Sequence, residues 1–112
     1  MSIRDELQAL ADQMNRNPEG VAGLRAVFRF ELSGEESGVY QVTFNGDQVT
    51  YSEGAAGDAD CTLHLSDQNL VKLIHGELNP TTAFMMGKLK VQGNLGLSLK
   101  LQQVLQHYQS NQ

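Results

Sequence analysis

Residues 24–51, LRAVFRFELSGEESGVYQVTFNGDQVTY, carry the clearest structural signal in this sequence. Apolar side chains occupy alternate positions over 24–32 and again over 40–44, so each segment predicts a strand with one apolar face. The pair Asn45-Gly46 is a strong signal for a tight hairpin, and residues 49–51 continue as a third strand. We therefore predict an antiparallel meander whose apolar face must be covered by other elements.

Helical patterns lie on both sides of this meander. Residues 3–14 carry apolar side chains at helical spacing, with Ser2 as the N-cap and Asn17-Pro18 as the stop. After a glycine-rich loop at 54–58, residues 61–65 alternate again and predict a fourth strand.

The second half of the chain predicts three more helices and one more strand. Ser66 caps a helix that ends at Gly76, and Asn79-Pro80 opens a short helix that ends at Gly87. Residues 89–91 predict a fifth strand and residues 95–108 a final helix, in which Leu95 and Leu99 widen the apolar stripe.

These elements predict one α+β domain over residues 1–112, with a five-stranded sheet in one layer and helices over one of its faces. Eleven apolar residues fall within the 22 residues from 84 to 105. A small domain can use all of them for its core. They also fit an interior hydrophobic cavity between the layers, in which neighbouring methionines adapt to different guests.

Composition limits the partners. The net charge of -5 argues against nucleic acid, although four lysines oppose a single glutamate from Lys72 onward and favour contact with anionic head groups. A single cysteine, no signal-peptide pattern and no apolar run of roughly 20 residues lead us to expect a cytoplasmic protein.

The residues that usually carry catalysis form no recognisable constellation. His64, His75 and His107 have no second ligand at a spacing that suits a metal, and Cys61 falls in the inward register of its strand, as a core residue does. No nucleotide or phosphate motif occurs. We therefore expect no catalytic residues, no metal and no cofactor, and interpret the chain as a binding protein.

Four blocks of sequence resemble the sterol carrier protein 2 domain family: Ala59-Asp60-Cys61-Thr62-Leu63, Ser66-Asp67, Gly76-Glu77-Leu78-Asn79-Pro80 with Ala83-Phe84-Met85, and Gly87-Lys88-Leu89-Lys90-Val91-Gln92-Gly93-Asn94. The resemblance implies a hydrophobic tunnel and non-covalent binding or transfer of fatty acids, fatty acyl-CoA, sterols or phospholipids. The sequence carries neither the C-terminal peroxisomal signal of eukaryotic members nor an attached enzyme domain, so we expect the free-standing microbial form. Met86 stands where the family often has glutamine, which predicts a more apolar pocket.

We expect a lipid chain to insert between the sheet and the helices, and Lys88, Lys90 and Lys100 to attract its head group or a membrane surface. The predicted ligand-binding residues are apolar and come from both layers: Phe28, Phe30, Val42, Leu63, Leu70, Ile74, Phe84, Met85, Met86, Leu99 and Val104.

Two alternatives share most of these features. An accessory domain holds a lipid-like intermediate, such as a polyprenyl quinone precursor, for a partner enzyme. A fully packed interaction module pairs its last helix with a second copy of the chain.

Overall fold

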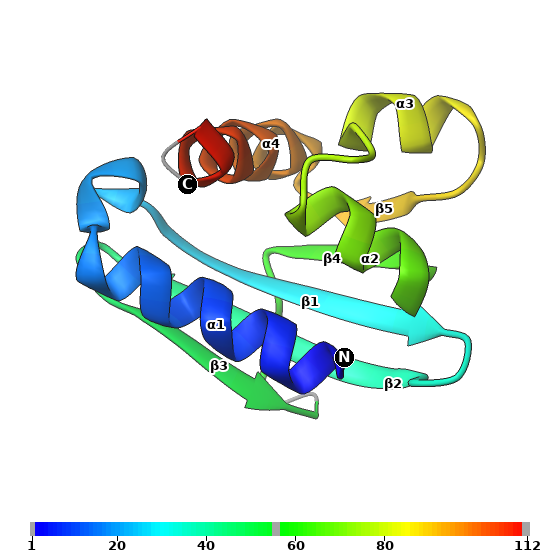
Figure 1. Ribbon diagram of the computed structural model, residues 1–112, viewed down its shortest axis with the longest axis horizontal. Helices are drawn as coiled ribbons and strands as arrows, with labels where there is room; N and C mark the ends of the chain where they lie inside the picture. Colours follow the sequence, from blue (N-terminus) through cyan, green and yellow to red (C-terminus); the bar gives the residue numbers. More distant parts are fainter. Residues whose placement is uncertain (1, 55–56, 111–112) are drawn as a thin grey trace.

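The computed structural model describes residues 2–54 and 57–110, so Ala55 and Ala56 of the predicted glycine-rich loop lie outside the described residues. Five strands form one sheet in the order β3-β2-β1-β4-β5 (Figure 1). The elements and their bounds, in chain order, are α1 (Ile3–Arg16), the 3-10 helix η1 (Pro18–Val21), β1 (Arg25–Ser33), β2 (Gly38–Asn45), β3 (Val49–Glu53), β4 (Cys61–Ser66), α2 (Asp67–Ile74), α3 (Pro80–Met85), β5 (Lys90–Gly93) and α4 (Leu95–Ser110).

The predicted meander is confirmed. β1 pairs antiparallel with β2, which pairs antiparallel with β3, and the turn at Asn45-Gly46 joins β2 to β3. β4 then lies parallel to β1 on its other side, and β5 pairs antiparallel with β4, which makes the sheet mixed. In β1 the apolar positions are buried and the alternate ones are partly exposed, as the alternation predicts.

The helices begin at the predicted caps. The Ser2 and Ser66 hydroxyl oxygens each accept a hydrogen bond from a backbone N–H three residues further on, and the Asn79 side chain accepts from two. α2 and α3 both end in a turn that needs a left-handed residue, which Gly76 (φ 78°) and Gly87 (φ 76°) supply without steric cost.

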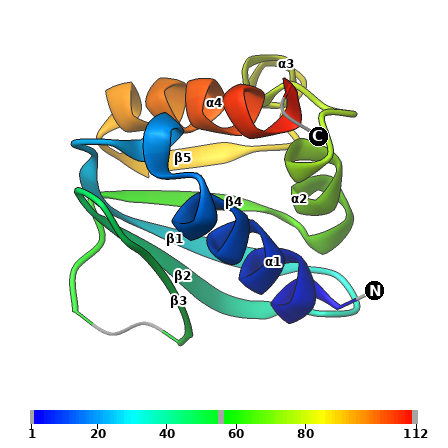
Figure 2. The ribbon, with the colours of Figure 1, turned by 60° about the vertical axis from the view of Figure 1, so that its left-hand side comes forward.

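The helices lie over one face of the sheet and enclose the core between the two layers (Figure 2). α1 covers the meander, and α4 covers the β4 and β5 end of the sheet. The inward side chains of α4 are buried, namely Leu101, Val104, Leu105 and Tyr108. Among residues 2–54 and 57–110, no helix combines the length and apolar character required to cross a bilayer.

Candidate functional site

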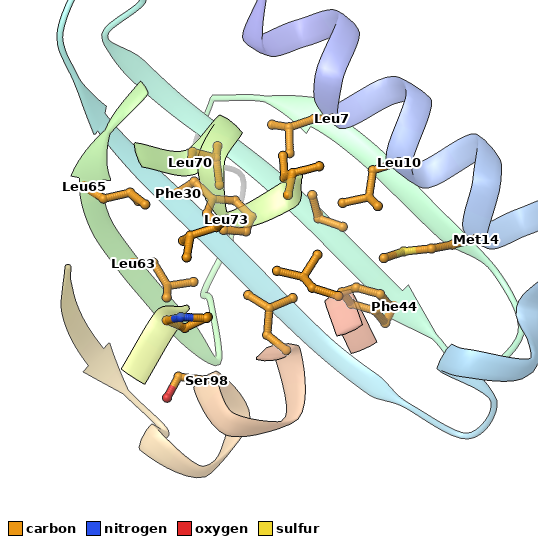
Figure 3. Close-up of a pocket in the computed structure, with 15 residues that line it drawn as sticks. Leu7, Leu10, Met14, Phe30, Phe44, Leu63, Leu65, Leu70, Leu73 and Ser98 are labelled. Carbon is orange, nitrogen blue, oxygen red and sulfur yellow. The ribbon is translucent and has the colours of Figure 1, made fainter. Parts of the chain in front are cut away.

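An apolar pocket lies in the interior, between the sheet and the helices α1, α2 and α4 (Figure 3). Its volume is about 20 Å³, which is room for about one water molecule. The pocket is therefore nearly closed, and a long alkyl chain enters only if the layers move apart. The residues that line it are Leu7, Leu10, Met14, Phe30, Val42, Phe44, Leu63, Leu65, Leu70, Leu73, Ile74, Pro80, Ser98, Leu101 and Leu105.

Five predicted residues line this interior pocket, namely Phe30, Val42, Leu63, Leu70 and Ile74. As expected from the spacing of apolar residues along the strands and helices, these side chains point inward from both layers. Whether they contact a ligand stays a prediction.

Two predicted residues are buried elsewhere in the core, which corrects their expected place on the pocket wall. Phe28 is 0% exposed and packs edge-to-face on Phe44, with ring centroids 5.5 Å apart. Val104 is 1% exposed and does not line the pocket either. Neither residue is among those that line the interior pocket, and whether they contact a ligand stays a prediction.

A surface groove of about 200 Å³ lies between α3, β5 and the start of α4. It is mainly apolar, and the predicted residues Phe84 and Leu99 line it. Pro80 and Ser98 line both this groove and the interior pocket, so the two spaces adjoin at these residues.

The exposed apolar side chains gather at the same end of the molecule. Phe84, Met85, Met86, Leu95 and Leu99 are 53–80% exposed. The expectation that Met85 and Met86 wall an interior cavity is therefore wrong, because α3 buries Ala83 and turns its other apolar side chains outward. Leu95 and Leu99 likewise extend the apolar stripe of α4 past the part of the helix that packs on the sheet, so both side chains are exposed.

Two of the three predicted head-group lysines lie away from the groove. Lys88 and Lys90 line a separate, wide surface hollow together with Glu31 and His64. Strand alternation explains the position of Lys90, because Leu89 and Val91 face the groove and Lys90, between them, points the other way. Lys100 is exposed on α4 next to Leu99.

A polar pocket of about 110 Å³, which the sequence reasoning missed, lies between α1 and the C-terminal ends of α2 and α4. His75 Nε2 lies 2.9 Å from Glu6 Oε2, and Glu6 is only 6% exposed. The other carboxylate oxygen of Glu6 is buried and has no hydrogen-bond partner among the described residues. The sequence does carry a signal for this polar pocket. Glu6 and Gln13 are seven residues apart, so these two polar side chains share a face of the helix with the apolar Leu10.

Two amide side chains complete the polar pocket. Gln109 donates to the carbonyl oxygens of Leu73 and Ile74 at 2.8 and 3.1 Å, and Gln13 donates to the carbonyl of Tyr108 at 3.3 Å. These hydrogen bonds hold the ends of the three helices together around the pocket.

The residues with reactive side chains are spread over the fold. Within the described part of the chain, no three His, Cys, Asp or Glu side chains lie close enough to hold a metal ion. Cys61 is buried in β4, as predicted, and burial together with the nearby Asp60 carboxylate raises the pKa of its thiol. A neutral thiol is a poor nucleophile.

The sequence profile of the SCP-2 sterol transfer family matches residues 6–106. The chain belongs to this family. Membership makes it a lipid-binding or lipid-transfer domain, and the SCP2 domain is a non-catalytic fold.

Solved SCP2 structures share the fold. The sterol carrier protein domain 2 of Helicoverpa armigera superposes with a TM-score of 0.74 and 27% identity, over 93% of this chain and 85% of that one. A structure titled UbiJ-SCP2 ubiquinone synthesis protein superposes with a TM-score of 0.71 and 26% identity, over 90% and 93%. The α+β architecture predicted from the sequence is thereby confirmed.

The similar curated sequences belong to longer proteins. Hydroxysteroid dehydrogenase-like protein 2 of Rattus norvegicus is 38% identical over 110 residues, which is 97% of this chain and 21% of that protein. The chain therefore spans about a fifth of the length of the curated relatives it matches.

Proposed function

We propose that this protein binds one long-chain lipid between its sheet and its helices and transfers it without a covalent step. The observation that carries the proposal is the junction at Pro80 and Ser98, where an apolar surface groove adjoins the apolar interior pocket. A chain that enters through the groove passes mainly apolar side chains on its way to the interior. Fatty acids, fatty acyl-CoA, sterol-like molecules and phospholipids are the candidate cargo.

Burial of the alkyl chain supplies the binding energy. Each buried methylene contributes on the order of 0.8 kcal/mol, so ten contribute about 8 kcal/mol before association costs. The same chain must also widen a nearly closed pocket. Leucine and methionine side chains line most of that pocket, and the thioether of Met14 adapts readily to a changed space. We expect affinities in the micromolar range.

The proposal includes brief contact with an anionic membrane surface in the cytoplasm. The exposed side chains Phe84, Met85, Met86, Leu95 and Leu99 surround the groove end, and apolar side chains in this setting insert into the interface of a bilayer. Lys100 is exposed on α4, and no acidic residue follows Glu77 in the sequence. Charge and apolar character therefore favour the same partner, an anionic bilayer.

Native mass spectrometry of the freshly purified protein tests lipid binding directly, because a retained lipid adds a mass that identifies it. Transfer is measured with a fluorescent lipid that moves from donor to acceptor vesicles. The proposal predicts saturable binding and a transfer rate that rises with protein concentration. A protein without bound lipid that also shows no saturable binding below about 100 μM would overturn it.

A second candidate function is presentation of a lipid-like intermediate to a partner enzyme. It is favoured by the larger size of the curated relatives and by the similarity to the UbiJ-SCP2 ubiquinone synthesis protein. A polyprenyl quinone precursor is cargo of this kind. Affinity capture that recovers an enzyme in a fixed ratio favours presentation, whereas transfer by the chain alone favours the carrier.

The packed interaction module remains the third alternative, because the interior void is small. Analytical ultracentrifugation separates it from the two lipid hypotheses. A stable dimer that binds no lipid supports the module.

A further inference from the structure

Three methionines lie in the described part of the chain, and their surroundings differ sharply. Met14 is 1% exposed and lines the interior pocket, whereas Met85 and Met86, at the end of α3, are 80% and 59% exposed. A methionine thioether becomes a sulfoxide when an oxidant reaches its sulfur. Exposure therefore directs oxidation to Met85 and Met86 and protects Met14.

Oxidation of these two side chains leaves the packing of α3 intact. Of the α3 residues Pro80–Met85, Ala83 alone is buried. The Met86 N–H donates to the Thr82 carbonyl at 3.0 Å, so backbone hydrogen bonds hold the end of the helix. A Cβ atom at the next residue, Gly87, would meet no atom within 4 Å beyond its chain neighbours, which shows that the space beside the pair is open. Both an oxidant and an enzyme that reduces the sulfoxide therefore have access.

Hydrogen peroxide is an oxidant of the right chemistry for this pair. A lone pair of the thioether sulfur attacks one peroxide oxygen, so an S–O bond forms as the O–O bond breaks. The sulfur gives up two electrons, which the peroxide accepts, and the departing oxygen takes the proton of the transferred oxygen and leaves as water. The product is a neutral but strongly polar sulfoxide in place of an apolar side chain.

The pair belongs to the surface that we propose to contact membranes. Two of the five exposed apolar side chains at the groove end are these methionines, and the others are Phe84, Leu95 and Leu99. Insertion into a bilayer interface requires apolar side chains, and a polar sulfoxide resists removal from water. Oxidation therefore weakens membrane contact without a change in net charge.

We propose that Met85 and Met86 form a reversible, peroxide-sensitive modification site whose oxidation releases the protein from membranes. This inference rests on the membrane contact in the proposed function. The reduced state is restored by the methionine sulfoxide reductases, one for each sulfoxide epimer. Because oxidation weakens docking, a bound membrane in turn slows oxidation of the pair.

The selectivity of the site is tested on wild-type protein that is treated with hydrogen peroxide and digested with trypsin. Met14 falls in the tryptic peptide 5–16, and Met85 and Met86 fall together in the peptide 73–88. Mass spectrometry should show two added oxygen atoms in peptide 73–88 before peptide 5–16 gains one. Equal rates of oxidation in the two peptides would overturn the site.

The effect on docking is measured by co-sedimentation with vesicles of phosphatidylcholine and phosphatidylserine. Oxidation of the pair should lower the affinity for these vesicles by about fivefold, and treatment with both reductases should restore it. Met85→Leu combined with Met86→Leu keeps the surface apolar and removes both sulfur atoms, so this variant should bind equally before and after peroxide. The wild-type series with and without reductase decides the question if the variant fails to fold.

The outcomes separate this site from the membrane contact itself. Undiminished vesicle binding by wild-type protein with both thioethers oxidised overturns the modification site and leaves membrane contact standing. The same holds if the double leucine variant loses binding after peroxide as the wild type does, because oxidation elsewhere, at Met14 or Cys61, is then the cause. Untreated wild-type protein that does not bind the vesicles overturns both.

Discussion

Pro80, at the first position of α3, and Ser98, in the first turn of α4, line both the interior pocket and the surface groove. The two residues therefore form the border that a ligand crosses when it passes from the surface to the interior. Ser98 is half-buried, and its hydroxyl donates a hydrogen bond to the Leu95 carbonyl within its own helix.

A bulky side chain at this border should obstruct passage. We expect Ser98→Phe to weaken lipid binding by about tenfold, or about 1.4 kcal/mol, while the free energy of unfolding changes little. Gln103→Phe places the same ring on an exposed position of α4 outside both pockets and is the control. Fluorescent-probe titration measures the affinity, and unchanged binding by Ser98→Phe would rule out this route.

Two of the three phenylalanines of the predicted site, Phe28 and Phe84, should behave differently. Phe28 is fully buried against Phe44, so Phe28→Ala should lower the free energy of unfolding by about 3–5 kcal/mol. Phe84 is 53% exposed in the groove, so Phe84→Ala should change stability by about 0.5 kcal/mol or less and weaken lipid binding. Urea unfolding and probe titration measure the two effects. Equal losses of stability would show that α3 is packed more tightly than the structure indicates.

The exposed apolar end should determine vesicle binding. Met85→Asp combined with Leu99→Asp should reduce co-sedimentation with vesicles that contain anionic lipid by about tenfold, because both side chains become charged where insertion requires apolar groups. Gln48→Asp combined with Thr50→Asp adds the same two charges at exposed positions of the meander and is the matched control. If the double variant sediments like the wild type, another face docks on the membrane.

Gly20 is required because α4 packs directly on η1. A Cβ atom at Gly20 would lie 2.5 Å from His107 Cδ2 and 2.8 Å from Tyr108 Cε2, and the Tyr108 hydroxyl donates to the Asn17 carbonyl beside it. Gly20→Ala should therefore lower the melting temperature and the free energy of unfolding, the latter by about 1–3 kcal/mol.

A glycine-to-alanine substitution on α4 itself supplies the comparison. At Gly96 a Cβ atom meets only the flexible Asn94 side chain, at 3.2 Å, and alanine favours the helix. Gly96→Ala should therefore be neutral or slightly stabilising. Similar losses from both substitutions would contradict the packing argument.

Alkaline pH should destabilise the protein through Cys61. Its folded pKa is raised, first by burial and then by Asp60, so the unfolded chain ionises at lower pH than the folded one. Stability from this group is complete below the ordinary thiol pKa of about 8.5 and is lost above it, with a slope of at most about 1.4 kcal/mol per pH unit. Urea unfolding between pH 7 and pH 9.5 should show this slope, and Cys61→Ala should flatten it. Identical slopes in both proteins would exclude Cys61 as the cause.

Local signals explain why the elements were predictable. The alternation in β1, the caps Ser66 and Asn79, and the terminating glycines each act over a few neighbouring residues, so their effect is readable without the rest of the fold. The same alternation correctly placed Phe30 and Leu63 on the inner face of the sheet.

Apolar character and spacing by themselves determined the two-layer fold of this protein, because they act over a few neighbouring residues, and four specific blocks of sequence indicated its family. Only the tertiary structure decided which apolar side chains are buried, since burial depends on how much of α3 and α4 packs against the sheet. The tertiary structure also decided the volume of the interior pocket. That volume is the small difference between the space that separates the sheet from the helices and the volume of the side chains that fill it. The contact between Glu6 and His75 joins residues 69 positions apart, and no local pattern specifies such a pair.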